Sequence, residues 1–130
     1  MNLLNKFIEY IFGEKLIPFD EFTKQLDDKL IEYGYKRGCG ICGVSEYTLF
    51  YFSFNCVFFQ IDHVCEQVIF VNNNPFDGFT NPFDGFTIFD KEKFTKTNLN
   101  LLFEKAKIFS KLEKKCRIQS KINEIEKDFI

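Results

Sequence analysis

The sequence predicts an α+β fold with two N-terminal helices, a small antiparallel sheet of about three or four strands, and a long C-terminal helix packed on the sheet. Three observations predict it. Apolar residues recur at three- and four-residue spacing near both ends of the chain, they alternate with period two over residues 46–72, and 130 residues is a usual length for one domain. We therefore expect residues 1–130 to form a single domain.

Two helices are predicted before the sheet. The first covers residues 2–12, where the apolar residues at helical spacing are Leu3, Leu4, Phe7, Ile8 and Ile11, and Gly13 follows. The second begins after Pro18, with Asp20 and Glu21 in its first turn, where carboxylates favour the positive helix end. Its apolar stripe consists of Phe22, Leu26, Leu30 and Tyr33, so the helix should end at Gly34 or soon after.

The middle of the chain predicts strands at 46–53, 56–62 and 67–72. β-Branched and aromatic residues alternate there, which is typical of a pleated sheet. Turn-forming residues at 53–55 and 62–66 separate the runs, as in an antiparallel meander. Large apolar side chains fall on both faces of the predicted strands, so we expect helices to cover at least one face.

A seven-residue repeat follows the strands. Residues 74–80 read NPFDGFT, and residues 81–87 repeat them without a change. Asn-Pro and Asp-Gly are turn formers, which predicts a loop. Two copies are too few for a solenoid, so the repeat is either a recent slippage duplication or a way to present Phe76 and Phe83 to a partner.

The C-terminal helix is predicted to start at Thr97 or Asn98 and to run to the end of the chain. Thirty helical residues span about 45 Å, which exceeds the width of a domain of this size. We expect a break near residues 116–119. The alternative is an unbroken helix whose end projects, where it could pair with a second copy in a homodimer.

Composition favours a cytoplasmic protein. Five cysteines, an odd number, follow no secretory signal, which argues for reduced thiols rather than disulfides. The longest apolar stretch, 48–61, is too short to cross a membrane. Residues 1–90 carry a net charge of −7 and residues 91–130 carry +5. An acidic body repels nucleic acid and attracts basic partners, and the basic C-terminal helix is diluted by glutamates.

The chain contains no complete set of residues for a familiar reaction, so we expect no enzymatic activity and no cofactor. The sharpest motif is the Cys39/Cys42 pair on a glycine-rich turn, which is half of a zinc site. His63 with Cys65, or with Cys56, could supply the other two ligands. The alternative to a metal-free protein is thus a zinc-stabilised nucleic-acid-binding or regulatory module built on Cys39, Cys42, His63 and Cys65.

In its general character the chain resembles bacterial immunity proteins, which are small and cytoplasmic and neutralise a toxin by binding it. The segment Glu14-Lys15-Leu16-Ile17-Pro18, followed by the helix to Gly34, resembles the entry segment of the SUKH immunity superfamily. The Gly-Gly pair expected after that helix is missing, so no residue is carried over from that superfamily. The resemblance implies one-to-one binding to a toxin domain, often a nuclease.

The predicted partner-binding surface combines acidic side chains with surplus aromatic residues. Interfaces of this kind place aromatic anchors at the centre, while charges steer the approach. The 24 aromatic side chains are more than a small core can hide completely. The candidate residues are Asp27, Asp28, Glu32, Asp62, Glu66, Phe76 and Phe83.

Overall fold

The computed structural model describes residues 3–4, 13–51, 54–71 and 85–129. Within this part the elements are α2 (Phe19–Glu32), β1 (Lys36–Cys39), β2 (Val44–Tyr51), β3 (Phe54–Asp62), β4 (Gln67–Val71), β5 (Phe86–Phe89), the short 3-10 helix η2 (Lys91–Lys93) and α3 (Lys96–Lys127). The helix predicted over residues 2–12 lies almost entirely outside the described residues.

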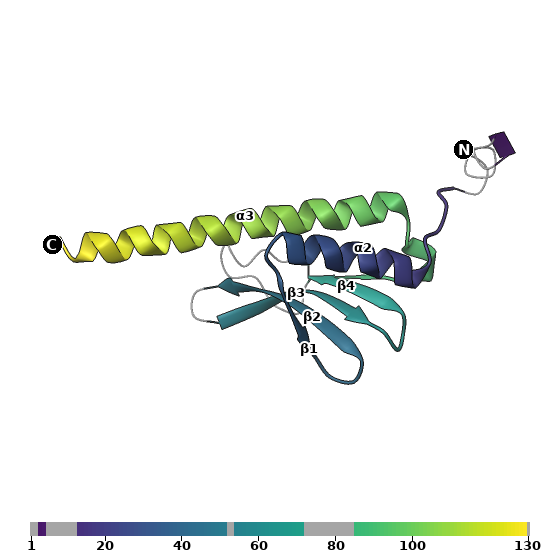
Figure 1. Cartoon of the computed structure of the whole chain (residues 1–130), viewed down its shortest axis with the longest axis horizontal. Coiled ribbons are helices and arrows are strands. Elements are labelled where there is room, and N and C mark those ends of the chain that lie inside the picture. The colour runs from purple at the N-terminus through teal and green to yellow at the C-terminus, as the bar shows by residue number, and fades with distance from the viewer. Residues whose placement is uncertain (1–2, 5–12, 52–53, 72–84, 130) are drawn as a thin grey trace.

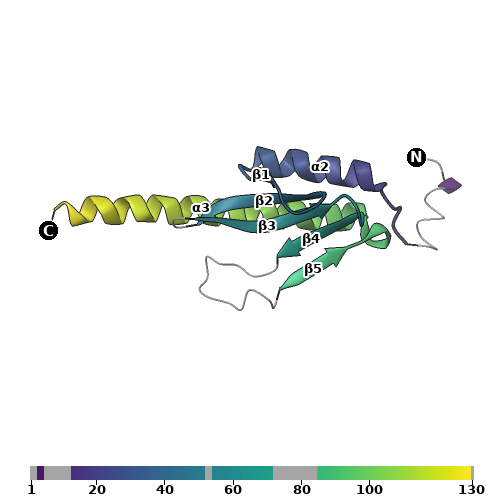
Figure 2. The ribbon, with the colours of Figure 1, turned by 90° about the horizontal axis from the view of Figure 1, so that it is seen from below.

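The strands form one antiparallel sheet in the order β1-β2-β3-β4-β5. Both α2 and α3 lie on the same face of it, and no described helix lies on the other face (Figures 1 and 2). The predicted α+β class is therefore confirmed, with five strands in place of three or four. None of the described helices combines the length and hydrophobicity that a membrane span requires.

The three predicted strands correspond to β2, β3 and β4, whereas β1 and β5 were not predicted. All four residues of β1 are exposed, so the strand carries no alternation that would reveal it. The second missed strand, β5, begins inside the second repeat copy. The prediction of a loop is therefore wrong for Phe86 and Thr87, and the rest of the repeat up to residue 84 lies outside the described residues.

A β-bulge in the β2–β3 pair shapes the core. Tyr47 lies opposite Phe59 and Thr48 lies opposite Val57, so the register of the two strands shifts by one residue at Phe58. An extra residue of this kind lets two successive side chains point to one face. Phe58 and Phe59 are accordingly both buried, at 1% and 0% exposure. The bulge thus places two phenylalanines beneath the helices.

Helix α2 matches its prediction closely. It begins after Pro18, and Phe22, Leu26 and Leu30 are fully buried against the sheet. It ends at Glu32, and Gly34 follows with φ +93°, a left-handed conformation that glycine adopts at no steric cost.

Helix α3 is continuous, so the predicted break near residues 116–119 is wrong. Thr95 caps its first turn by accepting a hydrogen bond from the backbone N–H of Asn98 at 3.2 Å. Its core face ends at Glu113, and the remaining turns project beyond the sheet toward the C-terminus (Figure 1). No proline or glycine interrupts residues 96–127, and residues with good helix propensity predominate, which explains why the helix continues.

The segment before α2 is attached to the start of α3. The backbone N–H of Ile17 donates to the carbonyl of Phe94 at 2.7 Å, and Leu16 forms an antiparallel bridge with Thr95. The carboxylate of Glu14 accepts a hydrogen bond from the backbone N–H of Thr97 at 2.8 Å. Hydrogen bonding to Thr97 lowers the pKa of Glu14. This carboxylate therefore interacts with the positive end of α3.

Candidate functional site

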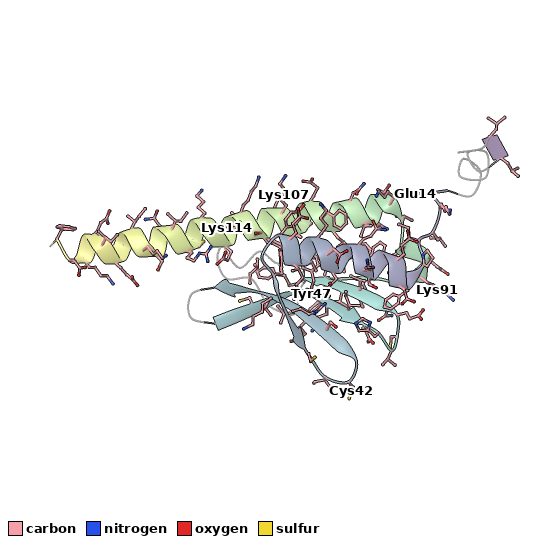
Figure 3. All side chains as sticks on the ribbon, in the orientation of Figure 1. Glu14, Cys42, Tyr47, Lys91, Lys107 and Lys114 are labelled. Carbon is pink, nitrogen blue, oxygen red and sulfur yellow. The ribbon has the colours of Figure 1, made fainter. Side chains whose placement is uncertain are left out.

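Asp27, predicted as a binding residue, makes hydrogen bonds that join three elements of the fold. One of its carboxylate oxygens, Oδ1, accepts hydrogen bonds from the hydroxyl of Tyr47 at 2.6 Å and from the guanidinium of Arg37 at 2.9 Å. Tyr47 is 2% exposed and lies on the helix-covered face of β2 (Figure 3). The carboxylate therefore joins α2 to β1 and β2, and it also raises the pKa of Arg37.

The other predicted acids fall into two separate groups. Asp28 and Glu32 lie exposed on α2, and Glu32 pairs with Lys29 at 3.3 Å. Asp62 and Glu66 lie in and beside the β3–β4 turn. That turn is close to the opposite end of α2, because the ring of His63 packs edge-on against Phe19 with centroids 6.0 Å apart. The structure does not gather the acids into one surface.

Asp62 stabilises its own turn. Its carboxylate accepts hydrogen bonds from the backbone N–H groups of Val64 and Cys65, both at 3.0 Å, which lowers the pKa of Asp62. Glu66 ends this turn with a positive φ of 53° and an exposed side chain. The two predicted aromatic anchors, Phe76 and Phe83, lie outside the described residues.

Substitution should separate the roles of two neighbouring acids. Replacing Asp27 with alanine should lower the free energy of unfolding by about 1–3 kcal/mol, because the buried hydroxyl of Tyr47 would lose its acceptor. Replacing the exposed Asp28 with alanine should change it by less than about 0.5 kcal/mol. Urea unfolding followed by circular dichroism measures both. Equal effects of the two substitutions would contradict the structural role of Asp27.

The predicted zinc ligands lie on two neighbouring turns at one end of the sheet. Cys39 ends β1, and Cys42 lies exposed at the tip of the β1–β2 hairpin (Figure 3). The backbone N–H of His63 donates to the carbonyl of Gly43 at 2.9 Å, which brings the β3–β4 turn beside this hairpin.

The side chains on these turns do not converge on one point. His63 shares a 3.1 Å hydrogen bond with Ser45, and the negative charge of Asp62 raises the pKa of the Cys65 thiol, which opposes the thiolate that zinc requires. Among the described residues, no three histidine, cysteine or acidic side chains are grouped so as to bind a metal ion. No observation on the described residues therefore favours the zinc alternative.

A cleft of about 270 Å³ lies where α2 ends, between β1, β2 and α3. Its residues are Tyr33, Gly34, Lys36, Thr48, Leu49, Glu113, Lys114 and Arg117. Glu113 is largely buried and faces Arg117 at 3.8 Å, so the carboxylate is partly neutralised by its neighbour. The cleft is basic, but none of its described lining residues is a cysteine, serine or histidine that could act as a nucleophile with its base.

The open sheet face, which we define as the face opposite the helices, carries a continuous apolar patch. Ile69 lies directly opposite Ile88, and Val71 lies directly opposite Phe86. Side chains opposed in this way are about 4.5–5.5 Å apart at Cβ. Phe86 and Ile88 are 52% and 46% exposed, and no described helix covers them (Figure 2). These four residues, the apolar patch, form a surface suited to another protein.

Polar residues continue the open sheet face beside the apolar patch. Gln60 lies next to Ile69 in the ladder, and it donates a 3.2 Å hydrogen bond to Glu46 on the adjacent strand. The open sheet face thus carries a polar pair, Gln60 and Glu46, next to the apolar patch. Protein interfaces combine an apolar centre with a polar rim in the same way.

The apolar patch was not among the sites predicted from the sequence. The signal was present, because the runs 68–71 and 86–89 are apolar at nearly every position and two-faced strands need cover on both sides. No protein-family model, curated protein or solved structure matches the chain. The assignment of a function therefore depends on the geometry alone.

Proposed function

We propose that the protein is a binding protein rather than an enzyme, and that it inhibits another protein by docking it on the open sheet face. The observation that carries this proposal is the apolar patch, in which Phe86 and Ile88 of β5 are about half exposed and Ile69 and Val71 of β4 are partly exposed. Leaving such side chains in water is unfavourable, whereas covering them with a partner contributes about 25 cal/mol per Å2 of apolar area.

The acidic charge of the body indicates the chemistry of the partner. Residues 1–90 carry a net charge of −7, and Glu46 lies on the open sheet face itself. A partner with a basic surface would associate faster because of this charge. We therefore propose a toxin domain such as a nuclease as the partner, neutralised in the cytoplasm in the manner of an immunity protein.

The partner should first be isolated with the intact chain. Tagged protein incubated in lysate of its native cell should retain one stoichiometric partner, identified by mass spectrometry. The affinity of the purified pair is then measured by titration calorimetry. Capture of no stoichiometric partner would contradict the proposal.

One exposed isoleucine tests the docking surface. The Ile88→Glu variant should bind the partner at least about 30-fold more weakly, because a charge would enter the centre of the interface. The matched control is Ile31→Glu on the outer side of α2, because Ile31 has the same exposure of 46%. Its affinity should change less than about threefold. Circular dichroism checks that both variants are folded, and equal weakening by both would place the interface elsewhere.

A further inference from the structure

The end of α3 is a helix without a core to pack on. From Lys114 to Lys127 every side chain is exposed except Cys116, which is half-buried. These 14 residues extend about 21 Å beyond the last buried turn, away from the sheet (Figure 1). Helices in proteins derive most of their stability from packing an apolar face. A segment of this length should therefore have a surface to pack against.

The projecting end carries an apolar stripe of its own, which we call the tail stripe and define as Ile118, Ile122, Ile125 and Phe129. Their spacing of four, three and four residues is that of the seam of a coiled coil. Their exposures are 59%, 42%, 58% and 84%. Each of these side chains exposes apolar area to water, and a second helix would cover that area.

The tail stripe faces away from the domain. At about 100° per residue, Ile122 lies roughly opposite Leu102, which belongs to the core face of the same helix. A second helix can therefore reach the stripe without meeting the sheet or α2. The domain of each copy would lie on the outside of such a pair.

The charges beside the tail stripe identify the occupant and its direction. The end nearest the domain is basic, with Lys114, Lys115, Arg117 and Lys121, and the far end is net acidic, with Glu124, Glu126 and Asp128 against the single cation Lys127. In a parallel pair the basic ends of two copies would coincide and repel. In an antiparallel pair each basic end lies nearer the acidic end of the other copy, so the stripe is complementary to itself.

We infer that the tail stripe pairs with the tail stripe of a second copy of this chain, running antiparallel. Centred between Ile122 and Ile125, the pair would stack Ile118 on Phe129 and Ile122 on Ile125, twice each. With Ile122 and Phe129 at a positions, Lys121 and Asp128 are both g positions, and g positions neighbour each other across an antiparallel pair, so Lys121 would lie beside Asp128 of the second copy. This inference does not rest on the proposed inhibitory function, because it uses a different surface.

The size of the contact sets its strength. Four apolar layers over 12 residues overlap along about 18 Å, which falls short of a standard interface of about 1,200–2,000 Å2. We therefore expect a dimer with a dissociation constant on the order of 10 μM. The two copies should exchange with monomer at working concentrations.

Sedimentation velocity of the full chain under reducing conditions tests the inference. Between about 1 and 300 μM the wild type should pass from monomer to dimer. The Ile122→Glu/Ile125→Glu variant should remain monomeric. The matched control is Leu101→Glu/Ile108→Glu, which places the same two charges on an exposed face of α3 outside the overlap, where exposures are 47% and 46%. This control should dimerise like the wild type.

Charge reversal tests the direction. Lys121→Glu alone should weaken dimerisation at least about threefold, and adding Asp128→Lys should restore it. In a parallel pair a g position instead neighbours an e position of the other helix, which would place Lys121 beside Glu126 of the second copy, so restoration by Glu126→Lys would overturn the antiparallel arrangement. A wild-type chain that stays monomeric at 300 μM, or an Ile122→Glu/Ile125→Glu variant that still dimerises, would overturn the inference. The Ile88→Glu variant should dimerise normally, which separates this test from that of the open sheet face.

Discussion

Replacing Phe94 with alanine should lower the free energy of unfolding by about 3–5 kcal/mol. Phe94 is fully buried where the chain enters α3, and its ring stacks on Phe22 of α2 with centroids 4.6 Å apart. The ring of Phe19 lies 5.8 Å away. Alanine would leave a cavity among these rings, and α2 would lose its ring contacts with the segment that leads into α3.

The matched control is Phe86→Ala, which makes the same change on the open sheet face. Phe86 is 52% exposed, so its removal should cost less than about 1 kcal/mol. Urea unfolding followed by circular dichroism compares the two variants with the wild type. Similar losses for both variants would show that Phe94 does not occupy the centre of the core.

Elements with one apolar face could be predicted from the sequence. The stripe of α2 identifies the helix because Phe22, Leu26 and Leu30 all face the sheet and a turn-forming glycine follows. The alternation over residues 46–72 identifies β2, β3 and β4 for a similar reason. In both cases the local pattern and the burial agree, which is the condition for a reliable prediction.

Strand β1 and the unbroken course of α3 could not be predicted from a local pattern of apolar residues. Strand β1 is exposed at every position and exists because its backbone pairs with β2. The predicted break in α3 was inferred from the width of the domain. Local propensity decides the outcome instead, since nothing between residues 96 and 127 terminates a helix. Length alone therefore does not determine where a helix ends.

The candidate site likewise has features that the sequence indicates and features that depend on tertiary neighbours. Composition indicated a surplus of aromatic and acidic side chains but not their positions. The hydrogen bonds of Asp27 join residues that lie 10 and 20 positions away, a tertiary arrangement that no local pattern reveals. The apolar patch likewise exists because β4 and β5 are paired and only one sheet face is covered by described helices.

Stability should fall steeply as the pH rises above about 10, because two buried tyrosines must stay protonated in the folded protein. Burial raises the pKa of Tyr35, whose hydroxyl donates to the carbonyl of Ala106 at 2.8 Å. Burial also raises the pKa of Tyr47, and its hydrogen bond to the Asp27 carboxylate adds to the effect. In the unfolded chain both hydroxyls ionise near pH 10.

The sign of the effect follows from this difference. Below pH 10 both tyrosines are protonated in both states, so their contribution to stability is constant. Above pH 10 the unfolded chain releases two protons that the folded protein retains, which favours unfolding. Each tyrosine should lower the free energy of unfolding by about 1.4 kcal/mol per pH unit, and the two together by about 2.7 kcal/mol.

Urea unfolding at intervals between pH 8 and pH 11.5 measures this slope. Tyrosinate absorbance at 295 nm, recorded with and without denaturant, should show more ionised tyrosine in the unfolded chain at pH 11. Tyr35→Phe and Tyr47→Phe should each cost about 1 kcal/mol at pH 8, where a hydrogen bond is lost. Each should also halve the slope above pH 10, because one retained proton disappears with each hydroxyl. An unchanged slope in the Tyr35→Phe/Tyr47→Phe variant would assign the alkaline unfolding to other groups.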